Sequence, residues 1–171
     1  MNQAVEMYYY HVWANQTLMN RLKELPREVY EQQVRSVFPT IAKGMAHIYL
    51  TDLSWFDIAT GKSMTEAMSD SRALTEEVES QSLEQLECLY RQLAERFKAF
   101  LSEQDDLDKT MVIDNPYAGV RDTRLSELLL QIVNHGTYHR GNITAMLRQM
   151  GHASVMTEYA LFWYQGEHAA Q

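Results

Sequence analysis

The chain has 171 residues, 46% hydrophobic and 22% charged, so we expect one domain over residues 1–171 with its own core, unlike disordered or fibrous proteins. Its 15 Lys and Arg residues are outnumbered by 23 Asp and Glu residues, and the net charge of −8 argues against binding to nucleic acid or to an anionic membrane surface. The single cysteine, Cys88, excludes an intramolecular disulfide.

The amino-terminal sequence MNQAVEMYYYHVWANQ lacks the basic start and the apolar run of a secretory signal. The chain also has no run that approaches the roughly 18 apolar residues needed for a membrane-spanning helix. A single cysteine is compatible with a reducing compartment. These features predict a soluble, cytoplasmic protein.

Four long segments carry apolar residues at helical spacing, with turn-forming residues between them. The first predicted helix runs from Gln3 to Leu25 and stops before Pro26, because proline disfavours helical backbone in the residue that precedes it. The second begins near Pro39, which suits a first helical turn, and ends at Gly61, which can adopt a left-handed stop.

The segment from Ser63 to Glu79 is polar with few aliphatic residues. We expect a long crossover connection there, with a short helical turn in it. The third helix opens with Ser82 and Gln85, which have the spacing of a capping box, and should end near Glu103.

The sequence MVIDNPYAGV, from Met111 to Val120, combines β-branched residues with an Asn-Pro turn and predicts a small hairpin. The fourth helix starts after Asp122 or Thr123 and ends at Gly151. Together these elements predict an all-α fold: a four-helix bundle with a long crossover connection and a small hairpin between helices three and four.

The carboxy-terminal tail contains the sequence TEYALFWYQ, which is too aromatic to remain in water. If residues 157–165 form a short helix, Tyr159, Phe162 and Trp163 share one face of it. That face would cover either the end of its own bundle or a neighbouring subunit.

Two histidines of the predicted fourth helix, His135 and His139, are four residues apart, which places them about 40° apart around the axis and one turn along it. They belong to a seam with steps of four and three, which predicts inward positions: Leu128, Ile132, His135, His139, Asn142 and Met146. Buried imidazoles need partners for their nitrogens, and a shared metal ion supplies one to both rings. The alternative is one core histidine bonded to Tyr or backbone and one surface histidine.

Among the other histidines, His47 is the best candidate for a third ligand, because small residues one turn before and after it leave space beside a bundle seam. His11 competes for this place, but bulky aromatic residues crowd its stretch of the first helix. His152 follows the end of the fourth helix and His168 lies close to the terminus, so both are expected in solvent.

The set His47, His135 and His139 predicts one divalent metal ion per chain, with Zn, Ni, Fe or Co as candidates. Three neutral imidazoles leave a coordination position for water or substrate. An ion there would activate a water or bind a thiol cosubstrate as thiolate. The chain has neither an H-E-x-x-H motif nor a Cys/His cluster, which argues against zinc proteases and zinc fingers.

Three segments resemble the DinB/YfiT-like family of metal-binding helical bundles, and the likeness extends over nearly the whole chain. The sequence HVWANQTLMNRLKELP is similar to the first helix of that family, and IAKGMAHIYLTDLSWF to its second. The closest match is NHGTYHRGNITAMLRQMG. In that family a histidine of the second helix and an H-x-x-x-H pair of the fourth bind the metal, which by position implies His47, His135 and His139.

The resemblance also implies a homodimer, and the family includes S-transferases and an isomerase that use low-molecular-weight thiols such as bacillithiol or mycothiol. The leading hypothesis is therefore a metal-dependent thiol S-transferase-like enzyme of the bacterial stress response, acting on a small molecule. The alternative is a non-catalytic metal-binding dimer in stress response or metal handling. DNA binding would need a basic face, and the fourth helix offers only Arg124, Arg140 and Arg148.

Overall fold

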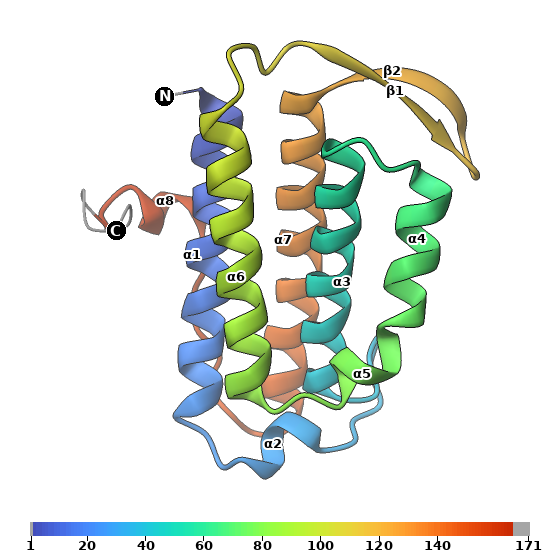
Figure 1. The fold of residues 1–171 in the computed structure, drawn as a ribbon. Helices are drawn as coiled ribbons and strands as arrows, with labels where there is room; N and C mark the ends of the chain where they lie inside the picture. The colour runs from blue at the N-terminus through green and yellow to red at the C-terminus, as the bar shows by residue number, and fades with distance from the viewer. Residues whose placement is uncertain (1, 166–171) are drawn as a thin grey trace.

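The computed structural model describes residues 2–165, which form a mostly helical fold with a small two-stranded sheet (Figure 1). The long helices are α1 (Gln3–Lys23), α3 (Ile41–Ala59), α6 (Leu83–Ser102) and α7 (Leu125–Gln149). The shorter elements are α2 (Glu28–Glu31), α4 (Met64–Ala73), α5 (Thr75–Glu79), β1 (Thr110–Asn115), β2 (Gly119–Arg124) and α8 (Tyr159–Phe162). No helix in this part of the chain has the length and apolar character to cross a membrane.

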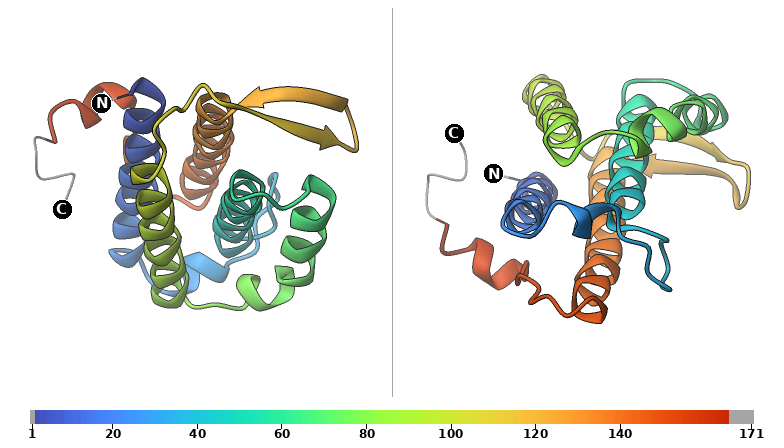
Figure 2. Two further views of the ribbon diagram at one scale, coloured as in Figure 1. Left: turned by 45° about the horizontal axis from the view of Figure 1, so that its top comes forward. Right: turned by 90° about the horizontal axis from the view of Figure 1, so that it is seen from below.

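The four long helices lie side by side: α1 packs against α6 and α7, and α3 packs against the same two helices (Figure 2). Each helix contributes fully buried apolar side chains to a shared core, for example Leu18, Ile48, Phe97 and Ile132. Burying one such side chain contributes about 1.5–3 kcal/mol. The mostly helical fold agrees with the predicted all-α class.

Helices α1 and α3 differ from prediction by one or two residues at their ends. Helix α1 ends at Lys23, two residues before the predicted Leu25. Helix α3 begins at Ile41 because Thr40, with extended backbone, accepts a hydrogen bond from the Lys43 N–H at 3.2 Å. Gly61 follows the end of α3 with a φ of +107°, as its predicted role as a left-handed stop requires.

Helix α6 has the predicted start signal, whereas α7 begins at Leu125, after Arg124 and not directly after Asp122 or Thr123. Ser82 and Gln85 form the capping box: the Ser82 hydroxyl accepts from the Gln85 N–H, and the Gln85 side chain accepts from the Ser82 N–H at 2.9 Å. At the start of α7, the Glu127 carboxylate accepts from the Arg124 N–H at 3.0 Å. Gly151 has a φ of +83° just beyond the end of α7.

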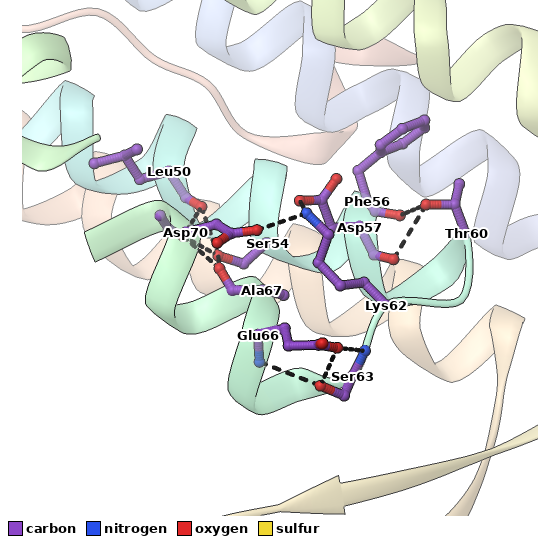
Figure 3. Close-up of polar contacts among 11 residues, drawn as sticks. Leu50, Ser54, Phe56, Asp57, Thr60, Lys62, Ser63, Glu66, Ala67 and Asp70 are labelled. Atoms are coloured by element: carbon purple, nitrogen blue, oxygen red, sulfur yellow. Dashed lines mark hydrogen bonds and ion pairs between the residues drawn. The ribbon is translucent and has the colours of Figure 1, made fainter. Parts of the chain in front are cut away.

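The connection over residues 63–79 is more ordered than predicted, because it forms two helices, α4 and α5, that pack on α3. A capping box of Ser63 and Glu66 begins α4. Lys62 then joins α3 and α4, since its ammonium group contacts Asp57 of α3 at 2.7 Å and Asp70 of α4 at 2.8 Å (Figure 3). The periodic signal of this segment is weak because only Ala67 of α4 is fully buried.

The predicted hairpin is present, somewhat longer than the segment from Met111 to Val120. Strands β1 and β2 pair antiparallel, with Ile113 opposite Arg121. Gly119 has a φ of +89° at the turn. Only Ile113 of the two strands is buried, and the hairpin reaches from α7 across to α4, which β1 contacts (Figure 1).

Helix α8 lies within the tail that was predicted to cover an apolar surface. Tyr159 and Phe162 pack on α1, with ring centroids 5.2 Å from Tyr10 and 5.8 Å from Trp13, respectively. Trp163 remains 62% exposed. The tail therefore covers its own first helix with two of the three predicted side chains.

Candidate metal site

Three imidazoles meet in the groove between α3 and α7. The Nε2 atom of His47 lies 3.2 Å from Nε2 of His139 and 3.1 Å from Nε2 of His135. One candidate ligand atom from each ring lies within 4.8 Å of the other two. Among residues 2–165, these three histidines are the group of His, Cys, Asp and Glu side chains placed closely enough to hold a metal ion.

These distances fit a single ion. In a tetrahedral site with metal–nitrogen bonds of about 2.0–2.1 Å, two ligand nitrogens lie roughly 3.3–3.4 Å apart. The two Nε2 separations from His47, 3.1 and 3.2 Å, are within a few tenths of that value. The arrangement needs only a small expansion to accept an ion.

The spacing within α7 and the packing of α3 on α7 produce this geometry together. His135 and His139 are one helical turn apart, so both rings project from the same side of α7. Helix α3 packs along that side of α7 and presents His47 to them. The ring of Phe38, which precedes α3, lies 5.4 Å from the His47 ring and 5.2 Å from the His139 ring and supports both.

Gly44 makes this packing possible, because a Cβ atom there would lie 3.0 Å from the Phe38 ring and 3.1 Å from Ile143. The space that the sequence suggested beside His47 is thus filled by an aromatic ring and an aliphatic side chain. It serves to support the imidazoles and does not form a cavity for the ion.

The site faces solvent, which corrects the prediction that both histidines of the fourth helix point into the core. His47 is exposed, and His135 and His139 are half-buried. On one side, a pocket of about 300 Å³ is lined by His47, Thr51, Arg72 and Glu79 together with neighbouring residues of α3, α4 and α5. Small molecules in this pocket can therefore reach the ring of His47.

The three rings favour the neutral form that binds metals. Burial, followed by the repulsion of neighbouring imidazolium charges, lowers the pKa of His135 to about 3. The same two causes lower the pKa of His139 to about 4. Loss of solvation also lowers the pKa of His47, and the nearby Asp52 carboxylate opposes that shift. At neutral pH each ring therefore has a lone pair to offer.

The remaining histidines lie elsewhere. His11 does not join the group: it is 2% exposed, and its Nε2 atom contacts the Asp52 carboxylate at 2.7 Å in the core. His152 is half-buried just beyond α7, where its N–H donates to the Leu147 carbonyl. His168 lies outside the described residues.

A buried polar network around His11 was missed in the sequence. Arg140 is 1% exposed, and its guanidinium donates to the side-chain oxygen Oδ1 of Asn15 at 2.9 Å and contacts Nδ1 of His11 at 3.1 Å. Arg140 therefore cannot contribute to a basic DNA-binding face. Asp52, which lies on the otherwise apolar face of its helix, could have indicated this network, because a buried carboxylate requires polar partners.

Comparisons with known proteins agree over nearly the whole chain. A family model described as "DinB family" matches residues 1–168. The sequence is 48% identical over 161 residues to Protein DinB of Bacillus subtilis (strain 168), covering 94% of each protein. A crystal structure of a DinB-like protein from Bacillus cereus ATCC 10987 has a similar fold, with a TM-score of 0.63, 22% identity, and coverage of 90% of this chain and 94% of that chain.

Proposed function

This chain belongs to the DinB family, and we propose that it binds one divalent metal ion through His47, His135 and His139. The convergence of three Nε2 atoms, two pairs of which lie 3.1 and 3.2 Å apart, is the observation that supports the proposal most directly. Neutral imidazoles suit Zn, Ni, Fe or Co. The four long helices would then serve as a four-helix bundle that holds the ion on one face.

We further propose that the protein is a metal-dependent thiol S-transferase-like enzyme, in which a small electrophile and a low-molecular-weight thiol meet in the groove between α3 and α7. A divalent ion with an open position supplies acidity that favours the thiolate form of a bound thiol or the deprotonated form of a water. The exposure of His47 and the adjoining pocket, which Arg72 also lines, support access for such molecules.

Ligation would replace the contacts between the Nε2 atoms and would also change the hydrogen bond of Asn142. The Asn142 amide nitrogen lies 3.3 Å from Nδ1 of His139. If Nδ1 accepts that hydrogen bond, the neutral ring carries its proton on Nε2, where the ion would bind. Rotation of the Asn142 amide by 180° lets its oxygen accept from Nδ1–H and frees the Nε2 lone pair. Asn142 would then orient His139 as a ligand.

One observation favours the alternative of a non-catalytic metal-binding protein. Glu79, the carboxylate that lines the pocket beside His47, is paired with Lys43 at 3.0 Å. The Lys43 ammonium group therefore already occupies an oxygen of this carboxylate. Catalysis would therefore depend on the ion itself for activation of the thiol.

The experiment measures the metal content of untagged protein and of two histidine variants. We expect about one ion per chain in the unaltered protein and severe loss in His139→Ala, because two ligands bind a divalent ion much more weakly than three. His152→Ala is the matched control and should keep its metal, since His152 lies outside the group. Equal loss in both variants, or in neither, would reject the ligand assignment.

A turnover measurement distinguishes a thiol S-transferase-like enzyme from a non-catalytic metal-binding protein. The metal-loaded protein is mixed with a low-molecular-weight thiol and a small electrophile, and thioether formation is followed. We expect a rate above that of the His139→Ala variant. A metal-loaded protein with no rate above this variant, across several thiols and electrophiles, would favour the non-catalytic alternative.

A further inference from the structure

A second cavity lies between α1 and α6, and none of the three imidazoles lines it. Its volume is about 320 Å³. The walls of this α1–α6 cavity are aromatic and aliphatic side chains, among them Tyr8, Tyr9, Trp13, Tyr90, Leu93 and Ala94. A cavity of this size and character is typical of small-molecule sites.

Three of the polar residues that line this cavity belong to the buried core: His11, Asn15 and Asp52. Each is at most 3% exposed. Asp52 uses its Oδ2 atom for His11, at 2.7 Å, whereas its Oδ1 atom is buried and has no partner within residues 2–165. A buried carboxylate oxygen without a hydrogen-bond donor costs folding free energy, so a ligand that donates a hydrogen bond to this atom would be stabilised.

The charges around the cavity cancel. Arg140 has no lone pair, so Nδ1 of His11 accepts its hydrogen bond, while Nε2 of His11 contacts the Asp52 carboxylate. The core then holds one acidic side chain, Asp52, and one basic side chain, Arg140, on either side of the His11 ring. At the rim, the exposed Arg91 and Glu95 again contribute one charge of each sign.

These features indicate what kind of molecule the cavity would bind. Flat aromatic walls favour a ring, the balanced charges favour a neutral molecule, and Asp52 Oδ1 accepts but cannot donate. We propose that the α1–α6 cavity binds a small neutral aromatic molecule whose hydroxyl or N–H group donates a hydrogen bond to Asp52 Oδ1. The site is separate from the proposed metal site, so its occupancy does not depend on the three imidazoles.

The first test compares two probes, 2-naphthol and 2-methoxynaphthalene, by calorimetric titration of the full chain. They share a ring system, but only the hydroxyl can donate. We expect the naphthol to bind about tenfold more tightly, as loss of one hydrogen bond to a charged acceptor implies. Equal affinity for the two probes, or no binding because the cavity holds only water, would overturn the proposal.

Variants then locate the binding. Ala94→Phe places a ring in the cavity and should abolish naphthol binding, whereas Ala99→Phe, at an exposed position of the same helix, should leave it unchanged. Asp52→Asn should remove the preference for the hydroxyl. If that variant does not fold, the comparison of Ala94→Phe with Ala99→Phe still tests where the naphthol binds. Binding that survives Ala94→Phe, or that is lost in His47→Ala, would contradict this location.

Discussion

Gly136 lies where the ring of His11 packs against α7. A Cβ atom at this position would collide with that ring and would lie 2.9 Å from the Arg140 guanidinium. Neither neighbour can move freely, because His11 and Arg140 hold each other within the buried network. The glycine is therefore required by close packing and not by backbone conformation.

We predict that Gly136→Ala lowers the free energy of unfolding by about 1–3 kcal/mol, the usual cost of overpacking a core. At Gly141, five residues along the same helix, an added Cβ atom would meet nothing within 4 Å, so Gly141→Ala should instead stabilise the helix by about 0.5–1 kcal/mol. Urea unfolding measures both. Changes of the same sign in the two variants would contradict this account.

The half-buried histidines also predict a pH dependence. Their pKa values in the folded protein, about 3 for His135 and about 4 for His139, are below the ordinary value of 6.5. The unfolded chain therefore binds more protons over this range, so chelator-treated protein should lose stability as the pH falls from about 6.5 to about 3. The double variant His135→Gln, His139→Gln should show a smaller loss in urea unfolding at successive pH values. An unchanged slope would show that these rings are not protected from protonation.

At the scale of single elements, the ends of the helices follow from local hydrogen bonds. Ser82, Ser63 and Thr40 each cap a helix with a side-chain oxygen. Such caps depend on residues three positions apart and act before distant parts of the chain come together. They explain why α6 begins where its sequence signal indicates.

Ser82→Ala removes the cap of α6, and we predict a loss of about 1 kcal/mol in the free energy of unfolding. Ser102, at the other end of the same helix, is exposed, and its hydroxyl donates to the Ala99 carbonyl. Ser102→Ala should therefore have an effect within about 0.5 kcal/mol. Chemical denaturation of both variants checks the difference, and a larger effect of Ser102→Ala would contradict it.

At the scale of the whole molecule, several large apolar side chains remain exposed, among them Leu130 and Tyr138 of α7 and Trp163 beyond α8. The tail already covers Tyr10 and Trp13 of α1. The remaining exposed rings are of the types that protein interfaces favour. We propose that they contribute to a homodimer.

Sedimentation equilibrium at micromolar concentration tests this assembly, and the expected mass is about twice the 19.9 kDa of one chain. A mass near that of a single chain would reject the dimer. Truncation after Met156 then assigns the tail: a folded monomer would place it at the interface, and an unfolded chain would show that the core needs it.

The sequence alone determined the elements that have strong local signals. Periodic apolar residues and caps predicted α1, α3, α6 and α7 to within a few residues, and the Asn-Pro turn predicted the hairpin. The prediction for the connection over residues 63–79 was wrong in part, because the short helices there bury little and so produce a weak periodic pattern in the sequence. The resemblance to the DinB/YfiT-like family was also evident in the sequence, and the family is shown by comparison.

The candidate metal site was likewise predicted from the sequence only in part. The spacing of His135 and His139 is a property of one helix, so the sequence could pair them, and it ranked His47 as their partner. Only the packing of α3 on α7 brought the third ring within 3.2 Å of the others and turned all three toward solvent. The same packing placed His11 in the core with Asp52, because the burial of a polar side chain depends on what the facing helices offer it.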